Sequence, residues 1–504
     1  MTTLYDKTPG QEDAPAPEAL LAAVETFLNG CRRPAVLEYG ENPLPLTAGC
    51  YALEIRSGRL CIEIWDETRS VSRRILGLER AATGLLDCSI QKFAGKPGRM
   101  TFLDLDRPQT AHRSLRAVRE NFAEQFRRML SRQFPGWEIA ALSSAQDLQH
   151  SFSSIYPRAK LRLGERRIAA MACTSMQDEA EMLSFALIWH RHVCARGENT
   201  ALCLFLPEDA GALTAHRLRW LTGGSLAPRL FRFNSHGSAG EVDPSDLGNV
   251  HTQVSGQYKP VLLNASLQEM LGRLEGIEGV GCCPELNGSV SIRSRGLEFA
   301  RIEAGRILLG LVSKRELAAC QTDDVVKFAA QLSGMRAVSQ HRPPSFPERE
   351  FESGVRRHLE AIDPTLLRTP VHGQVLSFAG GDRDLIDLLA VSESGRLAVL
   401  ELKASEDIHL PVQALDYWLR VAWHARRGEL RHLFPGIVLQ DTPPALLLVA
   451  PAMSFHPATV TILRYFSPGI DVERIGVNSD WQRNLRVVLR LKGSSVPISH
   501  GSSE

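Results

Sequence analysis

The sequence predicts a mixed α/β (α+β) protein in which helix-flanked mixed sheets alternate with small β-rich modules. The chain has 504 residues, more than one compact core usually holds, and this length predicts about three domains. Its 44% apolar and 23% charged residues are ordinary values for globular proteins. Short alternating apolar patterns, typical of strands, are interspersed with long amphipathic patterns, typical of helices.

Stretches rich in turn and breaker residues divide the chain. Residues 1–17 and 493–504 lack apolar periodicity and are predicted to be flexible tails. Two further stretches, 234–248 and 339–347, are dense in Gly, Pro, Ser and Asn and are predicted to be linkers. The predicted parts between them are a β-rich module at 18–110, an α/β domain at 111–235, a second β-rich module at 250–338 and a second α/β domain at 346–492.

The two β-rich modules share a strand pattern. Tyr51–Leu60 followed by Arg74–Leu78 is similar to Val290–Leu297 followed by Arg306–Leu311. Each segment alternates apolar and polar residues, and turn residues separate the segments. We therefore expect a small sheet in each module.

The two α/β domains are similar to each other at an offset of 229 residues. Phe122–Leu130 matches Phe351–Leu359, and the same offset superposes Trp189 on Trp418. Each domain is expected to contain a helix, strands, a long helix, a strand, a helix and a strand, forming a mixed sheet covered by helices. We infer an internal duplication, with chance similarity of two ordinary α/β domains as the alternative.

A predicted β-hairpin in the second α/β domain has charged residues where burial is expected. Ile386–Val391 is an apolar run with one acid, Ser392–Arg396 is a turn, and Leu397–Lys403 is a second apolar run that ends in charge. Because side chains alternate along a strand, Glu401 and Lys403 share one face. A charged pair on an otherwise apolar strand indicates a functional centre.

These residue types suit a metal-dependent hydrolase. If the hairpin brings Asp387 beside Glu401, the two carboxylates and the Leu402 carbonyl are oxygen ligands for Mg²⁺, with Mn²⁺ as a substitute. Such a cation lowers the pKa of a water molecule and neutralises charge that develops on a phosphodiester. Lys403 would orient that water or stabilise the transition state.

A helix predicted after Pro411 supplies two further candidates. Gln413 and Tyr417 are four residues apart, so they lie on one face and can act together on a backbone phosphate or on the lysine. The alternative is that the hairpin charges are a solvated strand end and a turn acid, and that both helix residues belong to an ordinary helix surface.

The ordered set of an aspartate, an ExK strand and a QxxxY helix resembles the PD-(D/E)XK nuclease superfamily, in its RecB-like branch. A helical glutamate commonly precedes the hairpin in that branch; Glu352 is at the matching place, and Glu350 and Glu348 compete for it. One departure is that no proline precedes Asp387. The resemblance covers the C-terminal domain only. It implies a restriction-endonuclease-like fold, DNA as the partner, and Asp387 and Glu401 as metal ligands.

The first α/β domain lacks the candidate residues at the corresponding positions. The ungapped offset replaces every one of them by a residue of different chemistry, which predicts an inactive copy serving as a built-in dimer partner, a clamp or a scaffold. The pairs are Asp387 with Arg158, Glu401 with Ala172, Lys403 with Thr174, Glu352 with Ala123, Gln413 with Ser184 and Tyr417 with Ile188.

Composition sets limits on location and partners. Lys plus Arg (58) nearly equals Asp plus Glu (57), so charge neither supports nor excludes a DNA partner. Ten cysteines without a CxxC pair favour reduced thiols, and no apolar run approaches the roughly 20 residues of a membrane span. No P-loop motif is present, so no ATPase motor is expected in the chain. We therefore expect a cytoplasmic protein without a membrane span.

The sequence thus predicts a Mg²⁺-dependent deoxyribonuclease whose active centre lies in the C-terminal domain. The alternative is a catalytically inactive DNA-binding or scaffolding protein that keeps a nuclease fold. The chain is expected to contain an internal pseudo-dimer and could be monomeric. Lys403→Ala distinguishes these alternatives, because only an enzyme loses DNA cleavage by this substitution.

Overall fold

The chain folds into two compact units, Met1–Asn121 and Phe122–Glu504. Most of both predicted tails and of the predicted linker before Pro347 lies outside the described residues. The computed structural model describes residues 16–38, 44–47, 49–56, 58–65, 70–92, 97–194, 200–222, 226–234, 236–246, 252–311, 313–318, 321–338, 347–379 and 382–495.

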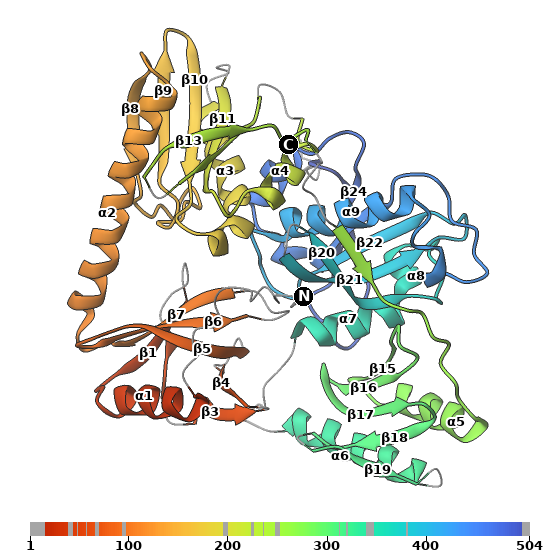
Figure 1. The fold of residues 1–504 in the computed structure, drawn as a ribbon. Coiled ribbons are helices and arrows are strands. Elements are labelled where there is room, and N and C mark those ends of the chain that lie inside the picture. Colours follow the sequence, from red (N-terminus) through yellow and green to blue (C-terminus); the bar gives the residue numbers. More distant parts are fainter. Residues whose placement is uncertain are drawn as a thin grey trace, which may run out of the picture. The chain divides into compact units, whose positions relative to one another are not determined.

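The first unit is an antiparallel seven-stranded sheet with helix α1 packed on it (Figure 1). Leu20, Val24 and Leu28 recur at helical spacing on α1 and enter the same core as alternate residues of the strands. The strand order is β2-β1-β7-β6-β5-β4-β3. The elements are α1(Pro17–Asn29), β1(Pro34–Glu38), β2(Leu44–Pro45), β3(Tyr51–Arg56), β4(Arg59–Trp65), β5(Ser70–Ala82), β6(Leu85–Gln91) and β7(Pro97–Asp104).

The second unit contains three sheets, so the whole fold is α+β, as the sequence patterns predict. Helix α2(Pro108–Gln133) begins in the first unit and ends in the second. The first α/β domain continues with β8(Glu138–Ser143), β9(Arg158–Leu163), β10(Arg166–Ala172), η2(Met176–Asp178), α3(Glu179–Val193), β11(Thr200–Pro207), α4(Ala212–Leu218), β12(Arg229–Phe233) and β13(Ala239–Val242).

A five-stranded antiparallel meander, β15 to β19, forms the smallest sheet, and its core includes residues of α5 and α6. Strand β14(Thr252–Ser255) precedes it in the chain but pairs with β20 at the edge of another sheet. The elements of the meander are α5(Ala265–Glu275), β15(Val280–Pro284), β16(Val290–Ser294), β17(Leu297–Glu303), β18(Arg306–Leu309), β19(Arg315–Leu317) and α6(Thr322–Val338).

The second α/β domain forms the remaining sheet, in the order β14-β20-β21-β22-β23-β24-β25. Helices α7 and α8 contribute residues to the core on one face, where they meet alternate residues of β21 and β22. Its elements are α7(Pro347–Arg357), α8(Leu359–Ile362), β20(His372–Ala379), β21(Asp382–Val391), β22(Leu397–Leu402), α9(Leu410–Arg426), η4(Arg431–Leu433), β23(Ala445–Pro451), η5(Ala452–Ser454), α10(Ala458–Leu463), β24(Asp471–Val477) and β25(Val487–Lys492).

The two α/β domains have the same strand order and the same strand directions. In the first, β8, β9 and β10 are antiparallel neighbours, β11 and β12 follow in parallel, and β13 is antiparallel. Strands β20 to β25 repeat this arrangement in the second. The predicted linker at 234–248 therefore contains a strand, β13, because its short Ala239–Val242 segment completes the sheet edge.

The two α/β domains contact each other through corresponding segments. Thr222 N–H donates to the Tyr465 carbonyl at 2.8 Å, and Ser467 N–H donates to the Trp220 carbonyl at 2.8 Å. An offset of 245 residues carries Trp220 onto Tyr465 and Thr222 onto Ser467. Each hydrogen bond is therefore the counterpart of the other, which is the reciprocity of a twofold interface. Helix α3 packs on α10 and α4 on α9 in the same reciprocal way.

A buried ion pair also joins these domains. The guanidinium of Arg217 on α4 donates to Asp416 on α9, with Nε 2.6 Å from Oδ1 and Nη2 2.5 Å from Oδ2. The two side chains are only 1% and 5% exposed. Such a two-point contact fixes α4 against α9 in one orientation, because a planar guanidinium matches a carboxylate in few geometries.

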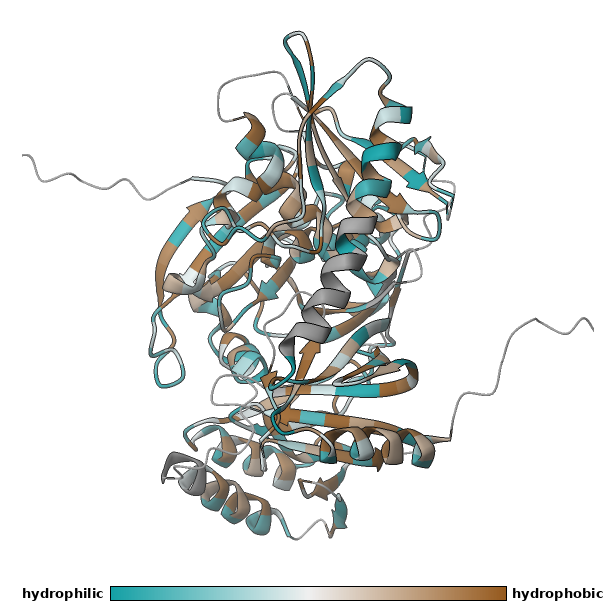
Figure 2. Ribbon diagram, turned by 90° about the vertical axis from the view of Figure 1, so that its left-hand side faces the viewer, coloured by the Kyte–Doolittle hydropathy of each residue, from teal (hydrophilic) through white to brown (hydrophobic). Residues whose placement is uncertain are grey.

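Hydrophobic and polar residues are distributed differently over the sheets, helices and loops. Figure 2 shows many hydrophobic residues in the strands, both kinds of residue on the helices, and many polar residues in the loops. Among the described residues, no helix is both long and apolar enough to cross a membrane.

Candidate active site

The predicted hairpin forms from strands β21 and β22, and its turn depends on one glycine. Gly395 has φ 87°, and a Cβ there would clash with the Val438 carbonyl oxygen. Ser392 N–H donates to the Arg396 carbonyl at 2.8 Å, which closes the turn. A glycine at this place lets the chain reverse in the left-handed conformation beside another backbone segment.

The hairpin brings Asp387 and Glu401 together. Leu388 pairs with Leu400, so the preceding residue of β21 lies opposite the following residue of β22, and their side chains share a face. The Leu402 N–H donates to Asp387 Oδ2 at 2.9 Å. Because a strand residue directs its N–H and C=O to the same edge, the Leu402 carbonyl also points toward β21.

The two carboxyl groups hinder each other's ionisation. Burial raises the pKa of Asp387 from its ordinary value of 3.8 to about 7, although Lys403 and the Leu402 N–H act in the opposite direction. Burial, followed by the charge of Asp387, holds the pKa of Glu401 well above its ordinary value. Glu401 is only 1% exposed. Two acids so placed disfavour simultaneous ionisation, and a cation bound between them would remove part of that cost.

Lys403 lies between two acids. Its Nζ atom is 3.6 Å from Glu401 Oε1 and 3.5 Å from Asp407 Oδ2. Burial favours the neutral amine, but the charges of Glu401 and Asp407 outweigh it and hold the pKa of Lys403 above its ordinary value. Burial likewise opposes ionisation of Asp407, yet Lys403 lowers the pKa of that carboxyl. Lys403 is therefore a cation at neutral pH.

Helix α9 covers β22 and brings Tyr417 into this acidic surrounding. Burial raises the pKa of Tyr417 well above its ordinary value, and the charges of Glu401, Asp384 and Asp387 raise it further. The Tyr417 hydroxyl thus stays protonated and can donate a hydrogen bond. The guanidinium of Arg420, one turn further along, lies 5.9 Å from the Tyr417 ring centre.

Two polar atoms at these positions have unmet hydrogen-bonding capacity. Within the part of the chain that the structure describes, Glu401 Oε2 and Gln413 Oε1 are buried and have no hydrogen-bond partner. A buried acceptor without a partner is costly, so it indicates a place for a ligand, an ion or a water. The same described residues include no group of three or more His, Cys, Asp or Glu side chains that could hold a metal ion. The oxygen atoms of Asp387, Glu401 and the Leu402 backbone are nonetheless of the donor type that hard cations such as Mg²⁺ prefer.

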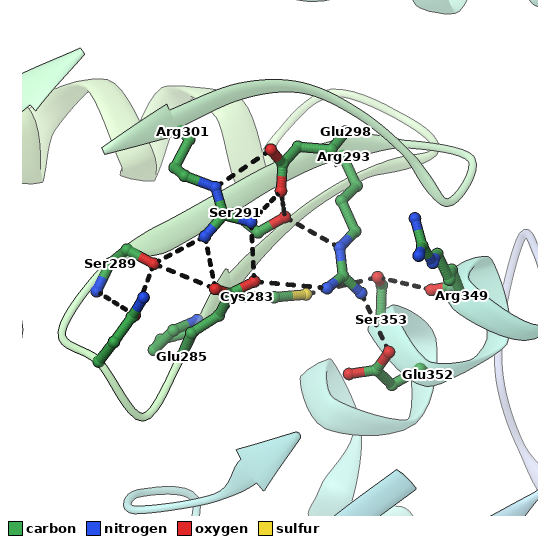
Figure 3. A network of polar contacts seen from close by, with 12 residues as sticks. Cys283, Glu285, Ser289, Ser291, Arg293, Glu298, Arg301, Arg349, Glu352 and Ser353 are labelled. Atoms are coloured by element: carbon green, nitrogen blue, oxygen red, sulfur yellow. Dashed lines mark hydrogen bonds and ion pairs between the residues drawn. The ribbon is translucent and has the colours of Figure 1, made fainter. Parts of the chain in front are cut away.

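Glu352 is engaged by two arginines. Its Oε2 atom accepts from Arg293 on β16 at 3.0 Å, and its Oε1 atom accepts from Arg356 at 3.3 Å. Figure 3 shows Glu352 pointing toward Arg293, which belongs to a larger polar network of the five-stranded sheet. The charge of Glu352 raises the pKa of Asp387. Its carboxylate thus anchors α7 to that sheet and influences the site electrostatically.

Two further acids influence the centre. Glu348, one helical turn before Glu352, raises the pKa of both Asp387 and Lys403. Asp384, which the sequence reasoning did not include, raises the pKa of Glu401. Asp384 lies on the same strand, β21, but before the apolar run Ile386–Val391, and strand alternation places residues three apart on opposite faces, so the local pattern did not indicate it. Among Glu348, Glu350 and Glu352, only Glu348 is one of the main charges that raise the pKa of Lys403.

The backbone opposite Asp387 is strained. Gln374 lies between the pairs Gly373–Leu388 and Val375–Ile386, and its φ is 54°. A non-glycine residue in the left-handed region is costly and often occurs at functional sites.

The strand register corrects the comparison between the two α/β domains. Lys403 N–H donates to the Val449 carbonyl, and Cys173 N–H donates to the Phe205 carbonyl at the same place in the first sheet. Lys403 therefore corresponds to Cys173, one residue before the position predicted by the ungapped offset. The corrected counterparts in this strand are Met171 for Glu401, Ala172 for Leu402 and Cys173 for Lys403.

A difference in turn length causes this shift. Leu163 pairs directly with Arg166 across a two-residue turn, whereas three residues separate Ser392 from Arg396 in the second hairpin. One inserted residue moves every later side chain to the other face relative to an ungapped alignment. Asp387 precedes the turn, so its predicted correspondence to Arg158 is unaffected.

The helices are shifted in the opposite direction. His190 on α3 contacts the Thr200 carbonyl at 2.7 Å, and Trp418 on α9 donates to the Pro444 carbonyl at 2.8 Å, at corresponding strand starts. The ungapped offset had paired Trp418 with Trp189. The corrected counterparts are Phe185 for Gln413, Trp189 for Tyr417 and His190 for Trp418.

The centre of the first domain is filled by its own side chains. The Arg158 guanidinium lies 4.5 Å from the Phe152 ring centre and 5.8 Å from that of Trp189. It also donates to the Ala145 carbonyl at 2.7 Å. Where the second domain holds two mutually repelling acids, the first holds a cation satisfied by aromatic faces and backbone oxygens.

No protein-family model matches the chain, and a search of curated proteins finds no relative.

Proposed function

We propose that the protein is a metal-dependent DNA nuclease with one active centre, in the C-terminal domain, built around Asp387, Glu401 and Lys403. The observation that carries this proposal is the buried carboxyl pair. Burial raises the pKa of both acids, the charge of Asp387 raises that of Glu401 further, and Glu401 Oε2 has no hydrogen-bond partner among the described residues. Lys403 offsets part of this unfavourable charge. A bound metal cation would offset the rest.

Each residue of the centre has its own proposed role. Asp387, Glu401 and the Leu402 carbonyl would hold the cation, Mg²⁺ or Mn²⁺, which would supply a water of lowered pKa and positive charge opposite a phosphodiester. Lys403, as a buried ammonium, donates hydrogen bonds and stabilises negative charge; it is not a base. Gln413 and Tyr417, one helical turn apart on α9, would orient a backbone phosphate or the attacking water.

The shared architecture supports the same proposal. A helix, three antiparallel strands, a helix and a parallel strand follow one another in the second domain, forming the helix-flanked mixed sheet that the resemblance to PD-(D/E)XK nucleases implies. The first domain repeats this topology with Met171, Cys173 and Arg158 at the key places. We infer an internal duplication in which that copy has lost catalysis, giving a pseudo-dimer within one chain.

The test uses the purified full chain with single-stranded, duplex, branched and flap DNA, in Mg²⁺ or Mn²⁺. The expected result is cleavage that requires the cation, is lost in Lys403→Ala and is retained in Met171→Leu. Met171→Leu is the matched control because it changes the counterpart of Glu401 while conserving volume.

Two outcomes contradict the proposal. If the wild-type chain cuts none of these DNAs with either cation, the protein is not a nuclease of this kind. If wild type and Lys403→Ala cut equally well, the active centre lies elsewhere.

A further inference from the structure

The loop that follows Lys403 holds this lysine from one side. Asp407 Oδ2 lies 3.5 Å from Lys403 Nζ, and Asp407 Oδ1 accepts the backbone N–H of His409 at 2.7 Å. The conformation of the loop between β22 and α9 thus determines where Asp407 lies relative to the ammonium group of Lys403. Contacts that hold His409 in place therefore also hold this loop in place.

The His409 ring is held by the other α/β domain. Its Nδ1 atom is 3.0 Å from Ser184 Oγ, and its Nε2 atom is 3.8 Å from Glu181 Oε2. The Phe185 ring meets it edge-on, with centroids 5.2 Å apart at an interplanar angle of 76°. Three residues of helix α3 therefore surround one side chain of the active domain.

We propose that helix α3 of the inactive domain positions Lys403 for the reaction, acting through His409 and Asp407. The inference rests on the proposed nuclease function. His409 is a positioning residue: its contacts are with α3 and with the loop acid, and it acts on the lysine through Asp407. The inactive copy supplies no ligand or nucleophile, yet it completes the active centre.

The pseudo-symmetry explains why this contact exists. The shift of 228 residues that carries His190 onto Trp418 also carries Glu181 onto His409. These two counterparts therefore meet each other, as a residue on a twofold axis meets its own copy. Loss of catalysis in the first domain did not remove this contact, because it belongs to the interface and not to the centre of that domain.

The experiment measures steady-state cleavage by the full chain on the DNA that the wild type cuts fastest. In His409→Ala we expect kcat to fall about 10- to 100-fold, as for other residues that orient a catalytic group. KM and the Mg²⁺ concentration for half-maximal rate should stay at wild-type values, because His409 contacts neither substrate nor cation. Ser184→Ala should lower kcat about fivefold, the effect of one hydrogen bond.

A matched control separates positioning from stability. Tyr465→Phe removes a contact of the same domain interface, between the Tyr465 hydroxyl and His190 Nδ1 at 2.8 Å, but leaves His409 untouched. Both variants should lower Tm by similar amounts, whereas Tyr465→Phe should keep the wild-type kcat. His409→Gln, whose amide can still reach Ser184, should recover part of the lost kcat.

The outcomes distinguish two kinds of failure. A wild-type kcat in His409→Ala, or an equal loss of kcat in Tyr465→Phe, overturns the positioning role while leaving the nuclease intact. A wild-type chain without any cleavage overturns the proposed function, and this inference with it.

Discussion

The two α/β domains share one topology and differ in how their centres are satisfied. In the second domain, Asp387 and Glu401 face each other with raised pKa values, and one Glu401 carboxylate oxygen has no hydrogen-bond partner among the residues that the structure describes. In the first, Arg158 fills the corresponding place and is held by rings and a backbone carbonyl. The comparison teaches that the fold does not require the acids. Their unfavourable electrostatics in the second domain is therefore a cost that the proposed metal site would explain.

The largest expected effect concerns activity. Glu401→Gln should lower cleavage by at least about 100- to 1,000-fold, because it removes a ligand charge where the transition state needs it. Its counterpart variant Met171→Leu should retain the wild-type rate. The measurement is initial cleavage rate at saturating Mg²⁺, and a Glu401→Gln enzyme with wild-type activity would remove the distinction between the two centres.

The second effect tests whether the domains depend on each other. Arg217→Met leaves Asp416 buried and unpaired, and we expect a loss of about 3–5 kcal/mol in the free energy of unfolding. The double variant Arg217→Met with Asp416→Leu should regain most of this loss, because both charges are then absent. Urea denaturation of the full chain measures both. A single variant as stable as wild type would show that the pair does not hold the domains together.

Opposite responses are expected at the counterparts Asp387 and Arg158. Asp387→Asn should raise the stability of the metal-free protein by about 1–2 kcal/mol, since it removes a repelled carboxylate while keeping the hydrogen bond from Leu402. Arg158→Met should lower stability by about 1–3 kcal/mol, because backbone oxygens lose their donors. Urea unfolding without Mg²⁺ gives both values, and a destabilised Asp387→Asn would mean that this acid is structural.

The last prediction is a pH dependence that arises at the candidate centre. Asp387 has a folded pKa of about 7 against an ordinary value of 3.8, so its protonated form is favoured in the fold. Its contribution to stability is therefore full below about pH 4 and is lost as pH rises toward 7. Metal-free thermal unfolding between pH 4 and 7 should show this decline, and Asp387→Asn should flatten it. An unchanged slope in the variant would assign the decline to other groups.

Part of the site was predictable because it depends on local periodicity. Alternation along a strand places Glu401 and Lys403 on one face, and the hairpin pattern predicts Asp387 beside them. Helical spacing likewise groups Gln413 with Tyr417. The structure brings Asp387, Glu401 and Lys403 together on the paired strands and places Tyr417, on the helix that packs on β22, within reach of the charges of both acids. The order of helices and strands in both α/β domains could also be predicted, since each element has its own sequence pattern, whereas the strand order within each sheet came from the structure.

The rest depends on distant contacts or on single-residue insertions. Arg293, which forms an ion pair with Glu352, lies 59 residues earlier in the chain. No local sequence pattern links the two residues. The correspondence of Glu401 to Met171 could not be predicted, because one extra turn residue changes the register without altering either apolar run. The contact between Ser184 of α3 and His409 joins segments 225 residues apart.

The sequence by itself determined the chemistry of the candidate centre: its two acids, its lysine, and the helix residues beside them. Period-two and period-3.6 patterns are properties of neighbouring residues, so they can be seen in the chain before it folds. Only the tertiary structure decided which glutamate of α7 is anchored, which residues of the two domains correspond, and that α3 reaches His409. Those features arise from hydrogen bonds and packing between remote segments, whose geometry exists only once the sheets and helices have assembled.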